Sequence, residues 1–259
     1  MNKAPIGIFD SGIGGLSILN EVAELLPHED LIYVSDNAYA PYGNLSIEAI
    51  QDRSRKITQW FLEQNCKLVV VACNTATTNA ISMLRDSFNI PFVGIEPAIK
   101  PAVLHTKTGV VGVLATKGTL ASDLFHKTVQ TYAGGIDIIV REGKSLVGMI
   151  ENGTVDGNQM EKLLQGYLKP MIDAGADHLV LGCTHYPFLI PCLQKILSEE
   201  VNIVDCSPAV AKQVCRMLEK LDFSAFQKEN GTHRFYCTGS DQALKQHTPK
   251  DNIVYPLSI

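Results

Sequence analysis

The sequence predicts an α/β protein with two doubly wound parallel sheets. Short apolar runs alternate with helix-period segments along all 259 residues, which is the order expected of strands and crossover helices. Several runs are apolar at every position, as in strands that helices cover on both faces. Segments of the first half also resemble segments of the second, which indicates two related α/β halves.

Nine segments are predicted as strands because each is short, apolar and bounded by turn residues or charges. In chain order they span residues 5–10, 30–36, 67–72, 91–95, 109–114, 136–140, 177–182, 201–205 and 233–237. Helix-length segments separate most of them, so strands within one sheet are expected to run parallel.

The segments between the strands show helical periodicity and capping residues. Apolar residues recur at steps of three and four from Leu16 to Leu26. Ser46 is expected to cap a helix that runs through Trp60, and Ser207 is expected to cap the helix that follows it.

Two pairs of segments carry the internal similarity. Leu68-Val-Val-Val-Ala-Cys73-Asn-Thr is similar to Leu179-Val-Leu-Gly-Cys183-Thr-His, since in both a buried strand delivers a cysteine into a polar turn. Gly7-Ile-Phe-Asp10-Ser-Gly is similar to Gly112-Val-Leu-Ala115-Thr-Lys. The offsets are alike, 183 − 73 = 110 and 115 − 10 = 105 residues. Sites at these strand ends would face each other.

Composition excludes several classes of function. The chain is 46% hydrophobic and 19% charged, and its net charge is 22 − 27 = −5, which argues against a nucleic-acid partner. No apolar run approaches the roughly 20 residues that cross a bilayer, so no membrane partner is expected. The first ten residues lack a secretory h-region, and the seven cysteines form no Cys-x-x-C pair. We therefore expect free thiols and a cytoplasmic location.

The turn Asp10-Ser-Gly-Ile-Gly-Gly15 follows a predicted strand and precedes a helix. Backbone N–H groups at a helix N-terminus form an anion site, but the carboxylate of Asp10 would repel a pyrophosphate. Ser17 also stands where a dinucleotide fingerprint has its third glycine. Asp36, at the end of the second strand, keeps a dinucleotide oxidoreductase open as an alternative, and a glycine-rich turn without a ligand is another.

Cys73 and Cys183 are the main candidates for chemistry. Each follows a strand directly, at the sheet edge where α/β proteins bind ligands. Inverting a stereogenic carbon needs a base on one face and an acid on the other, and two facing thiols provide both. Asp10 and His185 are candidate proton-handling assistants. The alternative for either cysteine alone is a small apolar packing residue.

Other polar groups have weaker assignments. Cys183 and His185 are two potential zinc ligands, but no second cluster completes a site, so no metal is expected. The loop of residues 37–44 is either a lid or an ordinary connection. Because the motifs contain no arginine, a carboxylate ligand would be bound by backbone N–H groups and by Ser11, Asn74, Thr75 and Thr184. The remaining cysteines are predicted to be packing residues: Cys66, Cys192, Cys206, Cys215 and Cys237.

Four motifs together closely resemble the aspartate/glutamate racemase superfamily, and within it the enzymes that act on glutamate. They are Phe9-Asp-Ser-Gly-Ile-Gly-Gly15, Pro41-Tyr-Gly43, Ala72-Cys-Asn-Thr-Ala-Thr77 and Gly182-Cys-Thr-His-Tyr-Pro187. Their order and spacing match over nearly the whole chain. The resemblance implies a cofactor-independent racemase that interconverts L- and D-glutamate and supplies D-glutamate for peptidoglycan biosynthesis.

The resemblance also implies an architecture and a site. Two α/β domains related by pseudo-twofold symmetry, 1–97 plus 208–259 and 98–207, would hold the substrate in the cleft between them, and a homodimer is expected. Cys73 and Cys183 would be the acid/base residues, with Asp10, His185 and Glu151 assisting. The substrate site would be lined by Asp10, Ser11, Tyr42, Gly43, Asn74, Thr75, Thr184 and His185.

One stretch departs from the family pattern. Residues 141–145 read Arg-Glu-Gly-Lys-Ser, and the acidic segment after them reads Ile150-Glu-Asn-Gly153. Glu151 therefore either assists catalysis or is a solvated glutamate at a helix end. Two further alternatives concern the whole chain: a racemase of the same superfamily that acts on aspartate, and a non-catalytic amino-acid-binding protein on this scaffold.

Overall fold

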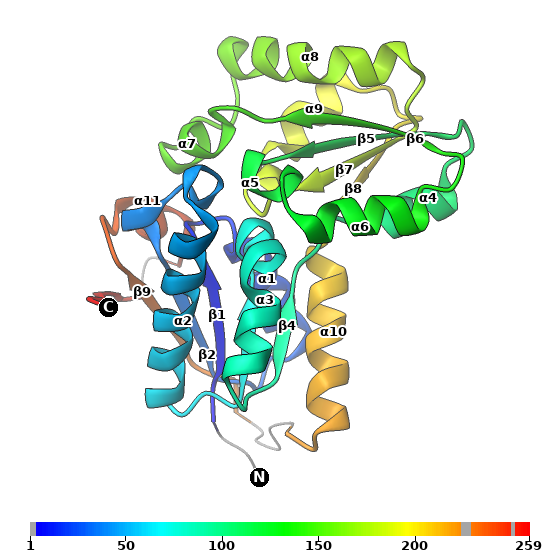
Figure 1. Ribbon diagram of the computed structural model, residues 1–259. Helices are drawn as coiled ribbons and strands as arrows, with labels where there is room; N and C mark the ends of the chain where they lie inside the picture. The colour runs from blue at the N-terminus through cyan, green and yellow to red at the C-terminus, as the bar shows by residue number, and fades with distance from the viewer. Residues whose placement is uncertain (1–3, 224–228, 250–251) are drawn as a thin grey trace.

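The protein is built around two parallel β-sheets, one above the other in Figure 1. The structure is a computed structural model and describes residues 4–223, 229–249 and 252–259. Within these ranges, no helix is long and apolar enough to span a membrane.

Sheet A has the strand order β10-β9-β2-β1-β3-β4 and sheet B the order β6-β5-β7-β8. Every pair of neighbouring strands is parallel. All nine predicted strands are confirmed, and β10 at the edge of sheet A is an additional one. The strands are β1 Ile6–Asp10, β2 Leu31–Ser35, β3 Leu68–Val71, β4 Phe92–Gly94, β5 Val110–Ala115, β6 Asp137–Glu142, β7 His178–Gly182, β8 Asn202–Val204, β9 His233–Cys237 and β10 Val254–Pro256.

The two sheets share a strand order, which supports the predicted relationship between the halves. The run β2-β1-β3-β4 of sheet A corresponds to the run β6-β5-β7-β8 of sheet B. In this correspondence β3, which leads to Cys73, is equivalent to β7, which leads to Cys183. Each half therefore has one cysteine just after an equivalent strand, β3 in sheet A and β7 in sheet B.

Helices cover both faces of both sheets (Figure 1). Sheet A lies between α1 Leu16–Leu25 with α10 Ser207–Lys220 and α2 Ile47–Glu63 with α3 Asn74–Ser87. Sheet B lies between α8 Asn158–Asp173 with α9 Ile190–Ile196 and α4 Ile99–His105 with α6 Asp123–Tyr132. The remaining helices are η1 Asn37–Tyr39, η2 Tyr42–Asn44, α5 Lys117–Leu120, α7 Leu146–Glu151, η3 Tyr186–Leu189 and α11 Gln242–His247.

One of the two predicted helix caps is confirmed and the other is wrong. The Ser46 hydroxyl accepts a hydrogen bond from the backbone N–H of Ala49, so it caps α2. Ser207 is itself the first residue of α10 and caps nothing. Its hydroxyl instead lies 3.0 Å from Asp205 Oδ1 and 3.1 Å from Ser17 Oγ, since a nearby carboxylate offers a stronger partner.

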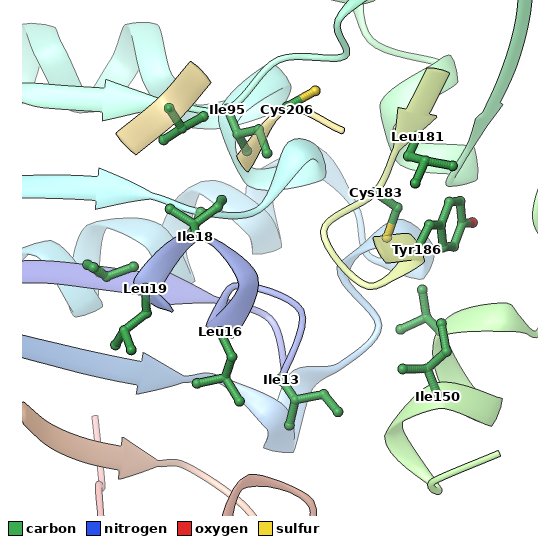
Figure 2. Packing of buried hydrophobic residues seen from close by; sticks show 14 of the residues in the cluster. Ile13, Leu16, Ile18, Leu19, Ile95, Ile150, Leu181, Cys183, Tyr186 and Cys206 are labelled. Carbon is green, nitrogen blue, oxygen red and sulfur yellow. The ribbon is translucent and has the colours of Figure 1, made fainter. Parts of the chain in front are cut away.

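The largest apolar core runs without interruption from one sheet to the other. It includes the inner residues of α1 and α10 on sheet A and those of α7, α8 and α9 on sheet B. In Figure 2, Ile13 and Leu16 lie on the sheet A side, and Ile150 and Tyr186 lie on the sheet B side. This shared core fixes how the carboxyl ends of the two sheets approach each other.

Candidate active site

The carboxyl ends of equivalent strands meet at one small cavity. Cys73 lies at the end of the β3 segment and is the N-cap residue of α3, and Cys183 follows β7 directly. The cavity is narrow, with a volume of about 10 Å³, and both cysteines line it. The two predicted thiols are therefore brought together from different sheets.

All the predicted site residues except Asp10 and Glu151 line this cavity. Asp10 is fully buried next to the cavity. Glu151 contacts the imidazole of His185, which does line the cavity. Three lining residues were missed as site residues from the sequence: Pro41, Thr116 and Val147.

Cys73 is a buried thiol at the N-terminus of a long helix. Its Sγ atom lies 3.8 Å from Ser11 Oγ, and the residue is 5% exposed. Burial raises the pKa of Cys73 well above its ordinary value, and the charge of Asp10 raises it further. Both effects favour the thiol form of Cys73.

His185 connects Cys183 to Glu151. Its Nδ1 atom is 3.8 Å from Cys183 Sγ, and its Nε2 atom is 2.5 Å from Glu151 Oε1. Burial alone would lower the pKa of His185, but the hydrogen bonds with Cys183 and Glu151 and the charge of Asp10 raise it well above its ordinary value. The ring is therefore an imidazolium, with one N–H group beside the sulfur.

Asp10 is the last residue of β1, and its side chain binds the backbone of the turn that leads to α1. Its Oδ2 atom accepts hydrogen bonds from the backbone N–H groups of Gly15, at 3.0 Å, and Gly12, at 3.4 Å, and its Oδ1 atom accepts one from Thr184. Burial raises the pKa of Asp10, and the neighbouring His185 offsets part of this increase. A carboxyl group with a raised pKa is a better proton acceptor than an ordinary carboxylate.

The sequence left open whether Glu151 is a solvated glutamate at a helix end. Glu151 does end α7, but its side chain is not solvated. Its Oε1 atom accepts hydrogen bonds from His185 Nε2 and from the backbone N–H of Ile13, and its side chain is 16% exposed. Burial would raise the pKa of Glu151, but its contacts with His185 and Ile13 lower it overall. Glu151 is therefore the ionised partner of the imidazolium.

The glycines of the first turn are required by the close approach of sheet B. A Cβ atom on Gly12 would lie 1.8 Å from Glu151 Oε1, and one on Gly14 would lie 2.4 Å from His185 Nδ1. Neither space can hold a methyl group. The absence of side chains on these glycines thus lets Glu151 and His185 pack against the turn, a contact that the sequence of the turn alone does not reveal.

Asn74 presents unpaired polar atoms to the cavity. Both Nδ2 and Oδ1 are buried and have no hydrogen-bond partner among the described residues. A buried amide without partners costs about 1–3 kcal/mol, so this side chain is suited to bind a polar ligand. Its position agrees with its predicted place in the substrate site.

A cluster of threonines joins the two sheets beside Asn74. Thr75 Oγ1 lies 2.8 Å from Thr116 Oγ1 and 3.3 Å from Thr119 Oγ1. The sequence contained a signal for Thr116, because it follows Ala115 as Ser11 follows Asp10 in the internal similarity.

The loop of residues 37–44, here called the Tyr42 loop, forms one wall of the cavity. Tyr42 and Gly43 line the cavity, while Asn37 Oδ1 accepts a hydrogen bond of 2.8 Å from the backbone N–H of Gly239. The backbone N–H of Ala38 donates to Thr238 Oγ1. The loop is thus connected by hydrogen bonds to the segment after β9 and forms a wall of the cavity.

The dinucleotide alternative fails at Asp36. Its two carboxylate oxygens accept hydrogen bonds from the guanidinium of Arg53, at 2.8 and 3.0 Å, and Tyr42 Oη donates to the same carboxylate. The side chain is fully buried. No oxygen of Asp36 is left to bind a ribose.

The cysteines outside the cavity are unpaired, and the predicted packing role is confirmed for most of them. All seven cysteines of the chain are free thiols. Cys66, Cys192, Cys206 and Cys237 belong to the apolar cores, whereas Cys215 is only half-buried. Over the described ranges, no group of three or more His, Cys, Asp and Glu side chains could hold a metal ion.

Known proteins resemble this chain over almost its full length. The family described as Asp/Glu/Hydantoin racemase matches residues 10–214. A glutamate racemase from Stutzerimonas stutzeri is 43% identical over 247 residues, which cover 95% of this chain and 93% of that protein. A second, from Roseiflexus, is 47% identical over 217 residues, 83% of this chain and 80% of that protein.

Two solved structures resemble the fold. The Escherichia coli glutamate racemase in complex with L-glutamate and the activator UDP-MurNAc-Ala superposes with a TM-score of 0.86 at 32% identity, covering 98% of each chain. The Francisella tularensis glutamate racemase in complex with D-glutamate superposes with a TM-score of 0.86 at 29% identity, covering all of this chain and 98% of the other.

Proposed function

Because the chain belongs to the Asp/Glu/Hydantoin racemase family, we propose that it interconverts L-glutamate and D-glutamate with Cys73 and Cys183 as its two proton carriers. The observation that supports this most directly is that both sulfurs line one small cavity and come from equivalent strands of different sheets. Removing a proton from one face of a carbon and returning one to the other requires this kind of pairing.

In one direction of the proposed reaction, Cys73 acts as the base. Asp10 accepts the thiol proton of Cys73, and the resulting thiolate takes the proton from the α-carbon. The electron pair of the broken C–H bond remains on the carbon as a carbanion. The thiol of Cys183 then gives its proton to the opposite face, which forms the new C–H bond and inverts the centre.

His185 assists at the second sulfur. Its imidazolium N–H lies beside Cys183 Sγ, where it can stabilise the thiolate left after protonation of the carbanion. Glu151 keeps the imidazole ring charged and oriented. In the reverse direction Cys183 is the base, and the roles of the two sulfurs are exchanged.

The uncharged donors of the cavity would hold the substrate carboxylates. Ser11, Asn74, Thr75 and Thr184 supply hydroxyl and amide groups, and the orphaned amide of Asn74 is the clearest of these. Bonds to neutral donors hold an anion without placing another positive charge beside the thiols.

The wider setting follows from the same proposal. We propose that the enzyme needs no cofactor, supplies D-glutamate for peptidoglycan biosynthesis in the cytoplasm, and works as a homodimer. We also propose domain boundaries at 1–97 plus 208–259 and 98–207. The division is supported by the membership of the two sheets, since β5 to β8 all lie between residues 110 and 204.

The purified protein should racemise L-glutamate in deuterated buffer without added pyridoxal phosphate. Circular dichroism would follow the loss of optical activity, and mass spectrometry would show one solvent deuterium at the α-carbon of the product. A strict requirement for pyridoxal phosphate, or a product without solvent deuterium, contradicts the two-thiol mechanism. L-aspartate assayed in parallel decides the substrate, because faster turnover of aspartate would replace glutamate in the proposal.

A further inference from the structure

Arg53 is a buried arginine that lies outside the cavity and contacts several segments at once. It lies on α2, and its side chain is 4% exposed. Its Nε and Nη2 atoms donate to the two carboxylate oxygens of Asp36, and its Nη1 atom donates to the backbone carbonyl of Ile259 at 2.7 Å. Its guanidinium carbon lies 3.9 Å from the centre of the Tyr39 ring.

These contacts connect Arg53 to the Tyr42 loop, which forms one wall of the cavity. Asp36 immediately precedes the Tyr42 loop, Tyr39 is part of it, and the hydroxyl of Tyr42 donates to the carboxylate that Arg53 holds. Tyr42 is 1% exposed and lines the cavity next to Gly43. The position of this wall therefore depends on where the guanidinium holds Asp36.

We infer that Arg53 is a positioning residue for substrate binding, which acts through Asp36 on Tyr42 and is itself held in place by the carbonyl of Ile259. The inference rests on the proposed function for the identity of the substrate. It assigns a role in the site to two residues that lie outside all four sequence motifs, one of them at the last position of the sequence.

The geometry of the guanidinium explains why a lysine would not replace it. A planar fork can donate to both oxygens of a carboxylate and to a third acceptor while its face packs on an aromatic ring. A lysine ammonium is a single point and cannot keep all of these contacts. A less firmly held Asp36 would leave the hydroxyl of Tyr42 without a fixed acceptor.

Replacing Arg53 should weaken substrate binding more than it slows proton transfer. The Tyr42 loop contributes a wall of the cavity, whereas the two sulfurs are placed by α3 and by the end of β7. An interaction that holds substrate and transition state equally well changes KM and leaves kcat nearly unchanged.

Steady-state racemisation of both glutamate enantiomers by the wild type, R53K and R55K tests the inference. Arg55 is the matched control, because it is exposed on the same helix and contacts Met83. We expect R53K to raise KM about tenfold for both enantiomers, equivalent to about 1.4 kcal/mol, with kcat within about threefold of the wild type. We expect R55K to match the wild type.

A purely structural role gives a different result. Partial misfolding would lower the active fraction, so kcat would fall while KM stayed constant, and that result overturns the inference. An R53K variant with both constants unchanged overturns it as well. If the wild type itself does not racemise glutamate, the proposed function fails instead, so the two failures are distinguishable.

Deletion of Ile259 tests the contact between its backbone oxygen and Arg53 and also serves if R53K does not fold. The deletion should raise KM several-fold in the wild type but add nothing in R53K, because the carbonyl acts only through the guanidinium. An unchanged KM in the deletion variant, or equal effects in both backgrounds, overturns the role assigned to Ile259. Calorimetric titration with L-glutamate should show the same loss of affinity without relying on turnover.

Discussion

The carboxylate of Glu151 accepts a hydrogen bond from the backbone N–H of Ile13, with 2.7 Å between the oxygen and the nitrogen. Glu151 ends α7, which is associated with sheet B, and Ile13 lies in the turn after β1 of sheet A. Because the same oxygen also contacts His185 Nε2, the bond connects the backbone of one sheet to the imidazole beside Cys183.

Replacing this carboxylate should change the pH dependence of the reaction. In E151Q, one of the groups that raise the pKa of His185 is lost, so the imidazolium is deprotonated at lower pH. We expect the basic limb of kcat against pH to shift to lower pH and kcat to fall roughly ten- to hundredfold, from the loss of a charged hydrogen bond of about 1.5–3 kcal/mol. E161Q, which removes a carboxylate that pairs with Lys195, is the control. An unshifted basic limb would argue against the assigned role.

Loss of either proposed proton carrier should abolish racemisation. C73A and C183A each remove the acid/base group from one face of the carbanion, so kcat should fall by about 10²–10⁴-fold or more. Because the equilibrium constant of a racemisation is one, kcat/KM must fall by the same factor for both enantiomers. C215A, at a half-buried cysteine, should keep wild-type kinetics. A C73A or C183A variant with more than a tenth of the wild-type kcat would exclude the two-thiol mechanism.

The same substitution should have opposite effects at two glycines. G12A places a methyl group within 1.8 Å of Glu151 Oε1, so it should displace the Glu151 and His185 pair and lower kcat by at least tenfold. A Cβ atom on Gly166, inside α8, meets nothing within 4 Å. G166A should therefore stabilise the helix by about 1 kcal/mol and raise Tm by about 2–4 °C, with activity unchanged. Thermal melts and assays of both variants check this, and an active G12A would show that the turn can move.

Asp177 lies far from the cavity, and its carboxylate should make the stability of the fold depend on pH. Its carboxylate accepts hydrogen bonds from Thr106 Oγ1, from His178 Nδ1 and from the backbone N–H groups of residues 107–108. Burial would raise its pKa, but these bonds lower it well below the ordinary value. A lowered folded-state pKa stabilises the fold fully above about pH 4, the ordinary range, and this stabilisation is lost gradually as pH falls from there through the folded-state pKa. D177N should therefore lower Tm by several degrees at pH 7 and by less at pH 3, whereas D173N should match the wild type at both. A constant gap in Tm would contradict this.

Much of the fold was predictable because strands and crossover helices leave periodic patterns. The cysteine-bearing strands and the internal similarity depend on runs of neighbouring residues; the strands are confirmed, and the shared strand order of the two sheets supports the similarity. Strand β10 was not predictable, since Val254–Pro256 is three residues long, includes a proline and becomes a strand only by pairing with β9.

The missed parts of the site depend on contacts between distant segments. Arg53 and Asp36 are 17 residues apart, and Glu151 and Ile13 are 138 apart, so no local pattern indicates that either pair forms. The Ser207 cap was wrong for a local reason, because its hydroxyl donates to the carboxylate of Asp205, only two residues before it. Sequence patterns predicted which strand ends meet at the cavity, and the tertiary structure determined which residues contact them.

The uninterrupted apolar core between the sheets limits how ligands are exchanged. Ile13 and Ile150 are almost completely buried on opposite sides of the junction, and a wide separation of the halves would expose both to water at about 25 cal/mol per Å² of apolar surface. A wide opening of the two halves is therefore disfavoured, and we expect ligand exchange at the cavity to need only a small relative movement of the two sheets.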